Sequence, residues 1–287
     1  MVNFNSTVVS KDSNFLNHEN RGLRYGDALF EAIRVIDGHI YFLEDHYLRL
    51  MSSMRILRME IPMNFTMEFL GKEIKTLLAA ENSKGAFRIR FTVFRNSGGL
   101  YLPTTNTISY AIEYNPLKDY YYQLSEKKYE VELFKDFFVN KDMLSNLKTN
   151  NRILNVVGSI YAKENDYDNC LLLNNQKQVV EALNGNIFTV NGKTIKTPPL
   201  TDGCLNGILR KQLVGILAKL EDYELLEASI SPFDLQKADE LFITNTIAGI
   251  ISITKYRKKL FITDTAKLLI QKLNAAAKLD TLKTNLN

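Results

Sequence analysis

The stretch Ser145–Arg152, SNLKTNNR, places one lysine, Lys148, among short polar residues and directly before an apolar run, ILNVVGSIYA. A lysine amine forms a Schiff base with an aldehyde when its surroundings position and deprotonate it. The ordinary alternative is a solvated charge near a helix start, although the positive end of a helix dipole disfavours a lysine there. Lys148 is therefore a candidate for chemistry whose role depends on the residues around it.

A carboxylate, Glu181, stands further along the chain in VVEALNGNIF, at the end of an apolar run that predicts a strand. A buried carboxylate needs a partner. A protonated pyridine nitrogen would be one, because the pairing keeps that nitrogen charged as an electron sink. The alternative is a glutamate at a strand end that faces solvent.

A candidate anion site lies in LNGILR, where an Asn-Gly pair precedes a predicted helix. The N–H groups of Ile208 and Leu209 would then be free at a helix N-terminus, which favours phosphate. The side chains of Arg49 and Thr246 could contact the same phosphate. Each feature alone is common, but the lysine, the carboxylate and the anion site together predict a phosphorylated, electron-withdrawing cofactor.

Other site classes find little support in the sequence. The cysteines and histidines have no metal-ligand spacing and form no disulfide framework, so no metal site is expected; they are Cys170, Cys204, His18, His39 and His46. The net charge of +4 comes from scattered Lys and Arg residues. Such a pattern is poor support for nucleic-acid binding and equally suits an anionic small molecule. Without a signal-peptide pattern or a membrane-length apolar run, a cytoplasmic location is expected.

The elements that must position these residues mix strands and helices. RVIDGHIYFLEDHYLRLMSSMRIL predicts a strand, an Asp-Gly turn, a second strand and a helix. Further helices are expected over about 66–80, 150–164 and 264–278, and short strands in CLLLN, QVVEA, NIFTV and KTIKT. The elements do not follow strict βαβ alternation, which predicts an α+β fold. We expect a smaller domain over 1–117 and a larger one over 118–287.

In their order along the chain, these motifs resemble the fold-type IV pyridoxal-phosphate enzymes, which include branched-chain and D-amino-acid aminotransferases and aminodeoxychorismate lyases. The resemblance runs from RGLRYGDALFEAIRV to ADELFITNTIAGI. EDHYLRL is similar to the family's H..RL helix, LKTNNRIL to its lysine segment and VVEALNGNIF to its V.E....N.F motif. LNGILR and FITNTIAGI are similar to its two remaining cofactor segments.

The resemblance implies a role for each matched residue. Lys148 would form the Schiff base with pyridoxal 5′-phosphate, and Glu181 would contact the pyridine nitrogen. The phosphate would be held by Arg49, Gly207, Ile208, Leu209 and Thr246. The family's fold implies two α+β domains with the cofactor between them, and its usual assembly implies a homodimer.

A substrate carboxylate calls for an arginine, and the candidates are Arg34, Arg88 and Arg90. In FRIRF, positions 88 and 90 share one face of a strand by alternation. All three could instead be solvated residues of a half-exposed sheet. Resemblance to the aminotransferases favours Arg34 and Arg90.

The sequence motifs support two different reactions. FEAIR resembles the aminotransferases, which move an amino group between a small amino acid and a 2-keto acid. LNGILR and RNSGG are closer to aminodeoxychorismate lyase, which releases pyruvate. The chain also departs from the branched-chain pattern at Ile153, which is a tyrosine there, and at 248–250, which lack a glutamate. A catalytically silent binding homologue is a third hypothesis, disfavoured because Lys148 and Glu181 are both retained.

Overall fold

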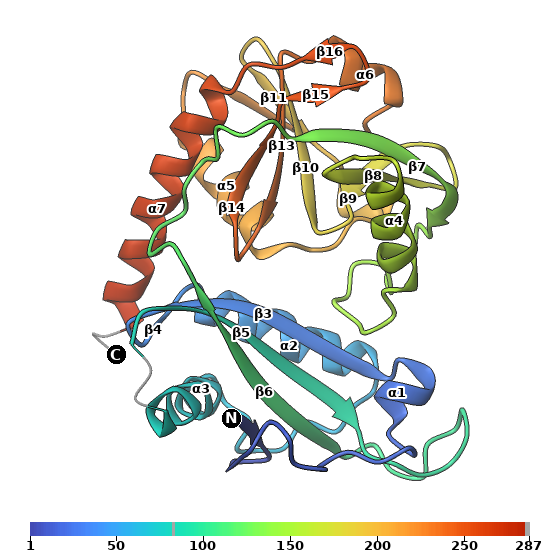
Figure 1. Cartoon of the computed structure of the whole chain (residues 1–287), viewed down its shortest axis with the longest axis vertical. Helices are drawn as coiled ribbons and strands as arrows, with labels where there is room; N and C mark the ends of the chain where they lie inside the picture. The colour runs from blue at the N-terminus through green and yellow to red at the C-terminus, as the bar shows by residue number, and fades with distance from the viewer. Residues whose placement is uncertain (82–83, 285–287) are drawn as a thin grey trace. The chain divides into compact units, whose positions relative to one another are not determined.

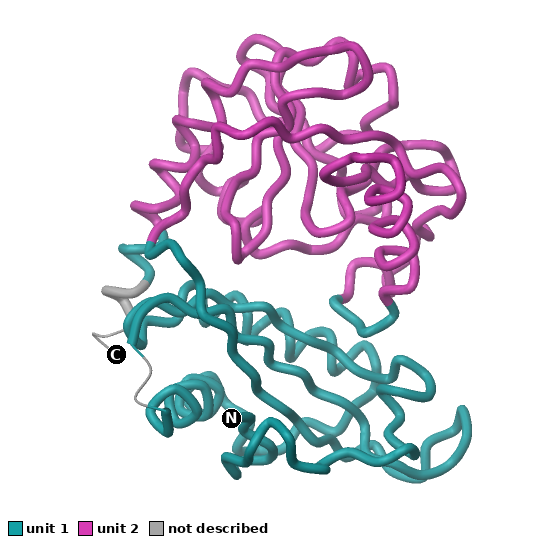
Figure 2. The backbone as a smooth tube through the Cα atoms, in the orientation of Figure 1, with its two compact units in different colours: residues 1–120, 148–151, 277–287 teal, residues 121–147, 152–276 magenta. Residues whose placement is uncertain are grey.

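The computed structural model describes residues 1–81 and 84–284, and the chain forms two compact units (Figure 2). Unit 1 comprises residues 1–120, 148–151 and the chain from residue 277. Unit 2 comprises residues 121–147 and 152–276. The segment 148–151 therefore belongs to unit 1, although the residues on both sides of it belong to unit 2.

Unit 1 is built on an antiparallel sheet with the strand order β2-β1-β6-β5-β3-β4 (Figure 1). Its strands are β1 (Val2–Phe4), β2 (Thr7–Val9), β3 (Ala28–Ile36), β4 (His39–Ile40), β5 (Ala86–Arg95) and β6 (Ile108–Leu117). Its helices are α1 (Arg21–Tyr25), α2 (Leu43–Ile56) and α3 (Met67–Ala80).

The hairpin predicted at the Asp-Gly pair joins β3 to β4. Asp37 and Gly38 both have positive φ angles, 46° and 81°, as a tight hairpin turn between twisted strands requires. Helix α2 then packs against β3, and α3 packs against α2. Ile33 and Ile89 from the sheet and Met54 from α2 are fully buried in this core. The predicted strand, turn, strand and helix are confirmed.

Unit 2 contains a mixed sheet in which β12-β11-β10-β9-β8-β7-β15-β16 follow in order, while β13 pairs with β10 and β14. The strands are β7 (Glu130–Val139), β8 (Asn169–Asn174), β9 (Val179–Ala182), β10 (Gly185–Asn191), β11 (Thr194–Thr197), β12 (Glu224–Glu227), β13 (Glu240–Asn245), β14 (Gly249–Ile253), β15 (Lys255–Tyr256) and β16 (Lys259–Leu260). The helices are α4 (Ile153–Glu164), the 3₁₀ turn Leu200–Asp202, α5 (Ile208–Leu217), α6 (Pro232–Lys237) and α7 (Asp264–Thr284), whose residues from 277 onward belong to unit 1.

Strand β13 shows how this sheet is buried on both faces. Leu241 and Ile243 enter one apolar cluster, while Phe242 points to the other face and stacks on Phe188 of β10 at a centroid distance of 5.1 Å. The strands predicted in CLLLN, QVVEA, NIFTV and KTIKT are confirmed as β8 to β11. The helix predicted over 150–164 starts later than expected, at Ile153, and the last one extends to Thr284. Because strands and helices mix without strict alternation, the predicted α+β class is confirmed.

Candidate active site

Lys148 lies in an extended segment at the edge of the unit 1 sheet. The N–H of Phe30 donates to the Lys148 carbonyl over 2.9 Å, and the N–H of Asn150 donates to the Ala28 carbonyl over 2.9 Å. Thr149 forms an antiparallel bridge with Leu29 between these two bonds. The lysine is half-buried and α4 starts only at Ile153, so the reading as a solvated helix-start lysine is wrong.

The ring of Phe30 lies close to two cationic groups, those of Lys148 and Arg90. The Nζ of Lys148 lies 4.7 Å from the ring centroid of Phe30, and the guanidinium carbon of Arg90 lies 3.8 Å from it. Arg90 also donates to Oδ1 of Asn150 over 3.1 Å and to Oγ1 of Thr92 over 3.2 Å. The ring therefore contacts both cationic groups through cation–π interactions, and the amide and hydroxyl oxygens orient Arg90.

The three candidate arginines lie on the same face of the β3–β5 pair. Arg34 is directly opposite Arg88, and Arg90 is opposite Ala32. Like charges directly opposite each other are unfavourable, so the face is suited to an anion. Arg34 is buried and donates to the Asp119 carbonyl, whereas Arg88 and Arg90 are half-buried.

Arg49 is held by two residues that the sequence analysis did not select, Glu31 and His46. Its Nε donates to Oε1 of Glu31 over 2.8 Å and its Nη2 donates to Oε2, which makes a two-point carboxylate fork. The Nδ1 of His46 lies 2.6 Å from Oε2 of the same carboxylate. His46 and Arg49 are three residues apart on α2, a spacing that puts both side chains on one helix face and was visible in EDHYLRL.

The pKa shifts in this buried cluster keep Glu31 ionised, and the ionised carboxylate holds Arg49. Burial alone would raise the pKa of Glu31, but the Arg49 charge and the bonds from His46 and Arg49 outweigh it and lower that pKa to about 2. Burial lowers the pKa of His46 below its usual value despite the opposing effect of Glu31. At neutral pH the cluster therefore consists of an anionic Glu31, a neutral His46 and a cationic Arg49.

In unit 2, Glu181 faces the turn that precedes α5. Its side chain belongs to β9, is buried, and accepts the N–H of Leu205 on Oε2 over 2.8 Å. Asn186 of β10, the cross-strand partner of Glu181, donates from Nδ2 to the Leu205 carbonyl over 2.8 Å. The reading of Glu181 as a solvent-facing strand-end residue is therefore wrong.

The start of α5 has the properties of an anion site. Gly207 is the N-cap, no side chain caps the helix, and its first turn has no acidic residue. The first intrahelical bond runs from Lys211 to the Gly207 carbonyl over 3.0 Å, so the N–H groups of Ile208 and Leu209 precede any intrahelical acceptor. A Cβ at Gly207 would lie 1.9 Å from Oδ1 of Asn186, which explains the glycine. These groups fit a phosphate.

Thr246 is half-buried in the tight turn between β13 and β14 of unit 2. The Tyr122 hydroxyl donates to the Thr246 carbonyl over 3.0 Å. Oδ1 of Asn245 accepts the N–H groups of Ile247 and Ala248 over 3.1 and 2.8 Å, so the turn is ordered by its own side chains. The turn holds Thr246 in one backbone conformation.

The site residues divide between the two units. Unit 1 contains Lys148 and the arginines 34, 49, 88 and 90; unit 2 contains Glu181, Gly207, Ile208, Leu209 and Thr246. Ile153, the position of a tyrosine in the branched-chain pattern, is the first residue of α4 and is 74% exposed.

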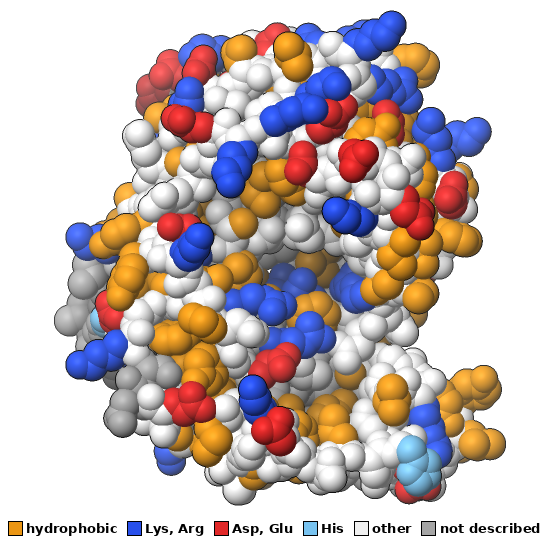
Figure 3. All heavy atoms as spheres, viewed as in Figure 1, with side chains coloured by type: hydrophobic (Ala, Val, Ile, Leu, Met, Phe, Trp, Pro, Cys, Tyr) orange, Lys and Arg blue, Asp and Glu red, His pale blue; other side chains and the backbone are white. Residues whose placement is uncertain are grey.

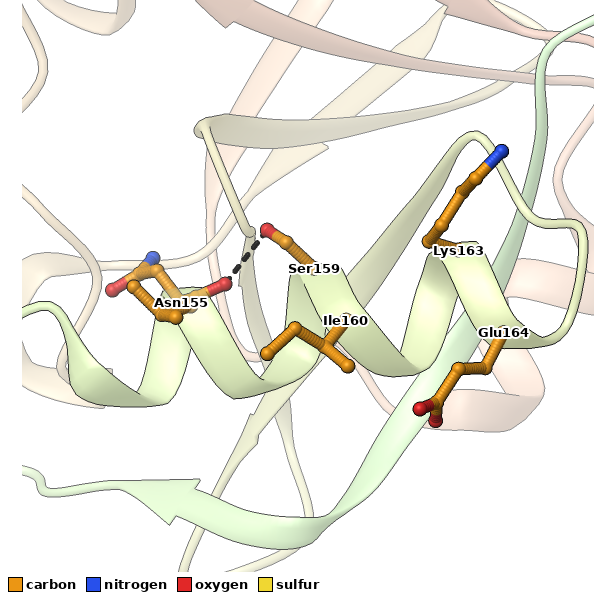
Figure 4. A pocket seen from close by; sticks show the side chains of 6 residues that line it. Asn155, Ser159, Ile160, Lys163 and Glu164 are labelled. Atoms are coloured by element: carbon orange, nitrogen blue, oxygen red, sulfur yellow. Dashed lines mark hydrogen bonds between the residues drawn. The ribbon is translucent and has the colours of Figure 1, made fainter.

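A separate hollow on α4 is not a competing active site. It is lined by one helix face that includes Asn155, Ser159 and Ile160, and the Ser159 hydroxyl donates to the Asn155 carbonyl of its own helix over 2.7 Å (Figure 4). The described residues contain no cluster of ligands able to hold a metal ion, and no helix among them is long and apolar enough to cross a membrane. Over unit 2, Figure 3 shows Lys and Arg side chains interspersed with Asp and Glu.

Comparison with known proteins identifies related sequences and folds. Residues 28–256 match the family described as amino-transferase class IV. A putative branched-chain-amino-acid aminotransferase from Methanocaldococcus jannaschii is 35% identical over 240 residues, which cover 81% of this chain and 79% of the relative.

Two solved structures share the fold over nearly the whole chain. A branched-chain aminotransferase from Thermoproteus uzoniensis, solved with norvaline, has a TM-score of 0.86 and 26% identity, and covers 98% of this chain and 95% of its own. A putative 4-amino-4-deoxychorismate lyase from Legionella pneumophila has a TM-score of 0.81 and 21% identity, and covers 93% of this chain and 97% of its own. At that identity, the second likeness concerns the fold alone.

Proposed function

This chain belongs to the class IV aminotransferase family, and from that membership we propose that it transfers an amino group between a small amino acid and a 2-keto acid with pyridoxal 5′-phosphate (PLP) as cofactor. The observation that carries the proposal is the setting of Lys148. Its backbone is hydrogen-bonded to β3, and its amine shares the Phe30 ring with Arg90. A binding protein without chemistry has no need of a lysine held in this way.

The donors of the chain suit each end of this cofactor. The first turn of α5, with Gly207, Ile208 and Leu209, offers backbone N–H groups for the phosphate. Arg49 and Thr246 supply a cation and a hydroxyl for the same group. The buried carboxylate of Glu181 suits a protonated ring nitrogen. When bound, the cofactor supplies an aldehyde and an electron-withdrawing ring.

The residues of the chain divide the remaining work. With the cofactor bound, the amine of Lys148 would hold its aldehyde, and the same amine would take up the proton that leaves the substrate Cα. The Glu181 carboxylate keeps the proton on the ring nitrogen. Arg34, Arg88 and Arg90 present cations on one sheet face and are proposed to bind the substrate carboxylate.

The alternative within the family is elimination of pyruvate from aminodeoxychorismate. It uses the same lysine, and a lyase-titled protein shares the fold. The two reactions differ in stoichiometry, because elimination needs no keto-acid acceptor. Release of pyruvate from aminodeoxychorismate without an added keto acid favours the lyase. Activity that depends strictly on an acceptor favours the aminotransferase.

The cofactor is tested first, by the visible absorption of the purified protein incubated with PLP and then reduced with borohydride. We expect an absorption band and, after reduction, a peptide in which Lys148 carries the cofactor's mass. Lys148→Ala should show neither, whereas Lys163→Ala, which removes a lysine from the last turn of α4, should behave as the wild type. An unchanged band in Lys148→Ala would overturn the proposal and favour the binding-protein hypothesis.

Two broader properties are also proposed. We expect a homodimer, as the resemblance implies, supported by an apolar stripe on α4 in which Ile153, Val156 and Ile160 are 74%, 52% and 52% exposed. Light scattering after size exclusion measures the molecular mass directly. We expect a cytoplasmic location, which fractionation of cells with an antibody to the chain can test.

A further inference from the structure

We propose that Asn186 is a positioning residue for the phosphate site, because it holds the backbone carbonyl of Leu205 just before α5. The inference rests on the proposed function, since it assumes that the first turn of α5 binds the cofactor phosphate. Asn186 lies on β10 in the β9–β10 hairpin and is buried, with 3% of its surface exposed.

The backbone N–H and the backbone carbonyl of Leu205 are both held by one cross-strand pair of side chains. Glu181 accepts the Leu205 N–H over 2.8 Å, and Asn186 donates to the Leu205 carbonyl over 2.8 Å. Glu181 and Asn186 are register partners on β9 and β10. The backbone of one residue, Leu205, therefore joins the carboxylate proposed for the ring nitrogen to the turn proposed for the phosphate.

A second amide side chain holds the same turn from the chain that precedes Lys148. Nδ2 of Asn146 donates to the Cys204 carbonyl over 2.6 Å and to the Leu200 carbonyl over 3.0 Å. The Asn146 carbonyl accepts the N–H of Asn206 over 3.2 Å. The backbone is thus fixed at Cys204 and Asn206, on both sides of Leu205. The Asn186 side chain is the side-chain donor that holds the Leu205 carbonyl between them.

The start of α5 is fitted tightly against Asn186. An ideal Cβ at Gly207 would lie 1.9 Å from Oδ1 of Asn186, so the glycine backbone and the amide occupy adjoining space. The Leu205 carbonyl also accepts the Gly207 N–H over 2.9 Å. A shift of the Leu205 carbonyl therefore moves the N-cap and, with it, the aim of the N–H groups of Ile208 and Leu209.

This arrangement predicts a defect that is specific for the phosphate. Without the Asn186 donor, the Leu205 carbonyl loses a partner and the N–H groups of α5 lose their fixed direction. Affinity for a phosphorylated ligand should fall by about fivefold, which corresponds to the loss of one hydrogen bond of about 1 kcal/mol. Affinity for the same ligand without its phosphate should change by less than about twofold, because none of these groups would contact the ring.

The test uses 4′-deoxypyridoxine 5′-phosphate and 4′-deoxypyridoxine, which lack the aldehyde and so cannot react with Lys148. Calorimetric titration gives both dissociation constants for full-length protein freed of cofactor. The variants are Asn186→Ala and the uncharged, similarly sized Asn186→Leu, which covers the case in which the alanine variant does not fold. The matched control is Asn184→Ala, an exposed asparagine in the same hairpin that bonds to Asn169 instead.

The ratio of the two dissociation constants decides the inference. A loss of preference for the phosphorylated ligand in a folded Asn186 variant, with the Asn184→Ala ratio unchanged, supports it. Equal weakening of both ligands, or no change in the ratio, overturns it and leaves the proposed function intact. A wild-type protein that binds neither ligand contradicts the proposed function itself, and the inference with it.

Discussion

The two units hold their parts of the candidate site in different ways. In unit 1 the functional groups are the ends of long charged side chains, such as Lys148 and Arg90, and other side chains orient them. In unit 2 the main groups proposed to bind the phosphate are backbone N–H groups at the start of α5, and side chains orient the backbone. The site in unit 1 therefore depends on the identity of the side chains proposed to contact the ligand. The start of α5 in unit 2 depends instead on the side chains that position its backbone.

This difference determines how each unit should respond to mutation. A change in unit 1 removes a charge or a nucleophile while the strand beneath it remains. A change behind the start of α5 in unit 2 should alter affinity without removing any group proposed to touch the ligand. Variants of the two kinds should therefore separate chemistry, stability and affinity.

The largest expected effect is that of Lys148→Arg, in which the cation and its Phe30 contact persist but the nucleophile is lost, because arginine stays protonated. We expect turnover to fall by roughly a thousandfold or more, while the free energy of unfolding changes by less than about 0.5 kcal/mol. Steady-state kinetics and denaturant unfolding measure the two quantities. Substantial activity in this variant would show that unit 1 supplies charge and not chemistry.

The next effect concerns the side-chain cluster behind Arg49. The pKa of Glu31 is lowered from 4.5 to about 2, so ionised Glu31 stabilises the fold above pH 4.5, and this contribution is lost as the pH falls towards 2. The difference corresponds to about 3 kcal/mol. Glu31→Gln should be less stable than the wild type at pH 7, and the gap should narrow as the pH falls below 4.5.

Denaturant unfolding at a series of pH values tests this prediction. The lowered pKa of His46 acts in the same direction, because protonation from about pH 6.5 downward favours the unfolded chain. Because Glu31 opposes the lowering of the His46 pKa, its replacement should lower that pKa further, so the gap is compared below pH 4.5, where Glu31 itself titrates. A gap that stays constant across the whole range would mean that the ionisation of Glu31 does not stabilise the fold.

The sequence predicted the main elements and the candidate site residues of both units, but not the residues that support those site residues. Lys148 and Glu181 could be selected because their order along the chain, together with the anion site, resembles a known family. The hairpin at Asp37 could be predicted because its turn requires positive φ angles. Glu31 and Asn186 were missed as functional residues. Their roles depend on strand register and on the approach of distant segments, which local spacing does not encode.

A smaller effect is expected in unit 2 from Gly207→Ala. The added Cβ would lie 1.9 Å from Oδ1 of Asn186, so one of the two must shift, at a cost of about 1–3 kcal/mol. The control is Gly215→Ala in the same helix, where no atom lies within 4 Å of the added Cβ. That variant should be stabilised by up to about 1 kcal/mol because alanine favours the helix.

A double-mutant cycle decides whether Asn186 is the source of the strain. In Asn186→Ala, the Gly207→Ala substitution should cost less, because the Oδ1 atom that the new Cβ meets is absent. Unfolding free energies of the four proteins give the coupling. Additive costs would mean that Gly207 is required for its backbone conformation and not for contact with Asn186.

The smallest expected effect separates Arg90 from Arg88 as the ligand of the substrate carboxylate. Arg90→Lys keeps the charge but loses the planar group that lies 3.8 Å from the Phe30 ring centroid and donates to Asn150. Because exposed cation–π contacts contribute about 0.5–1 kcal/mol, we expect KM for the amino acid to rise severalfold with little change in kcat. Arg88→Lys, on the same face of β5, is the matched comparison. If Arg88→Lys raises KM more than Arg90→Lys does, the carboxylate binds at the Arg34–Arg88 pair and not beside the lysine. The orientation by Phe30 and Asn150 would then serve Lys148 more than the substrate.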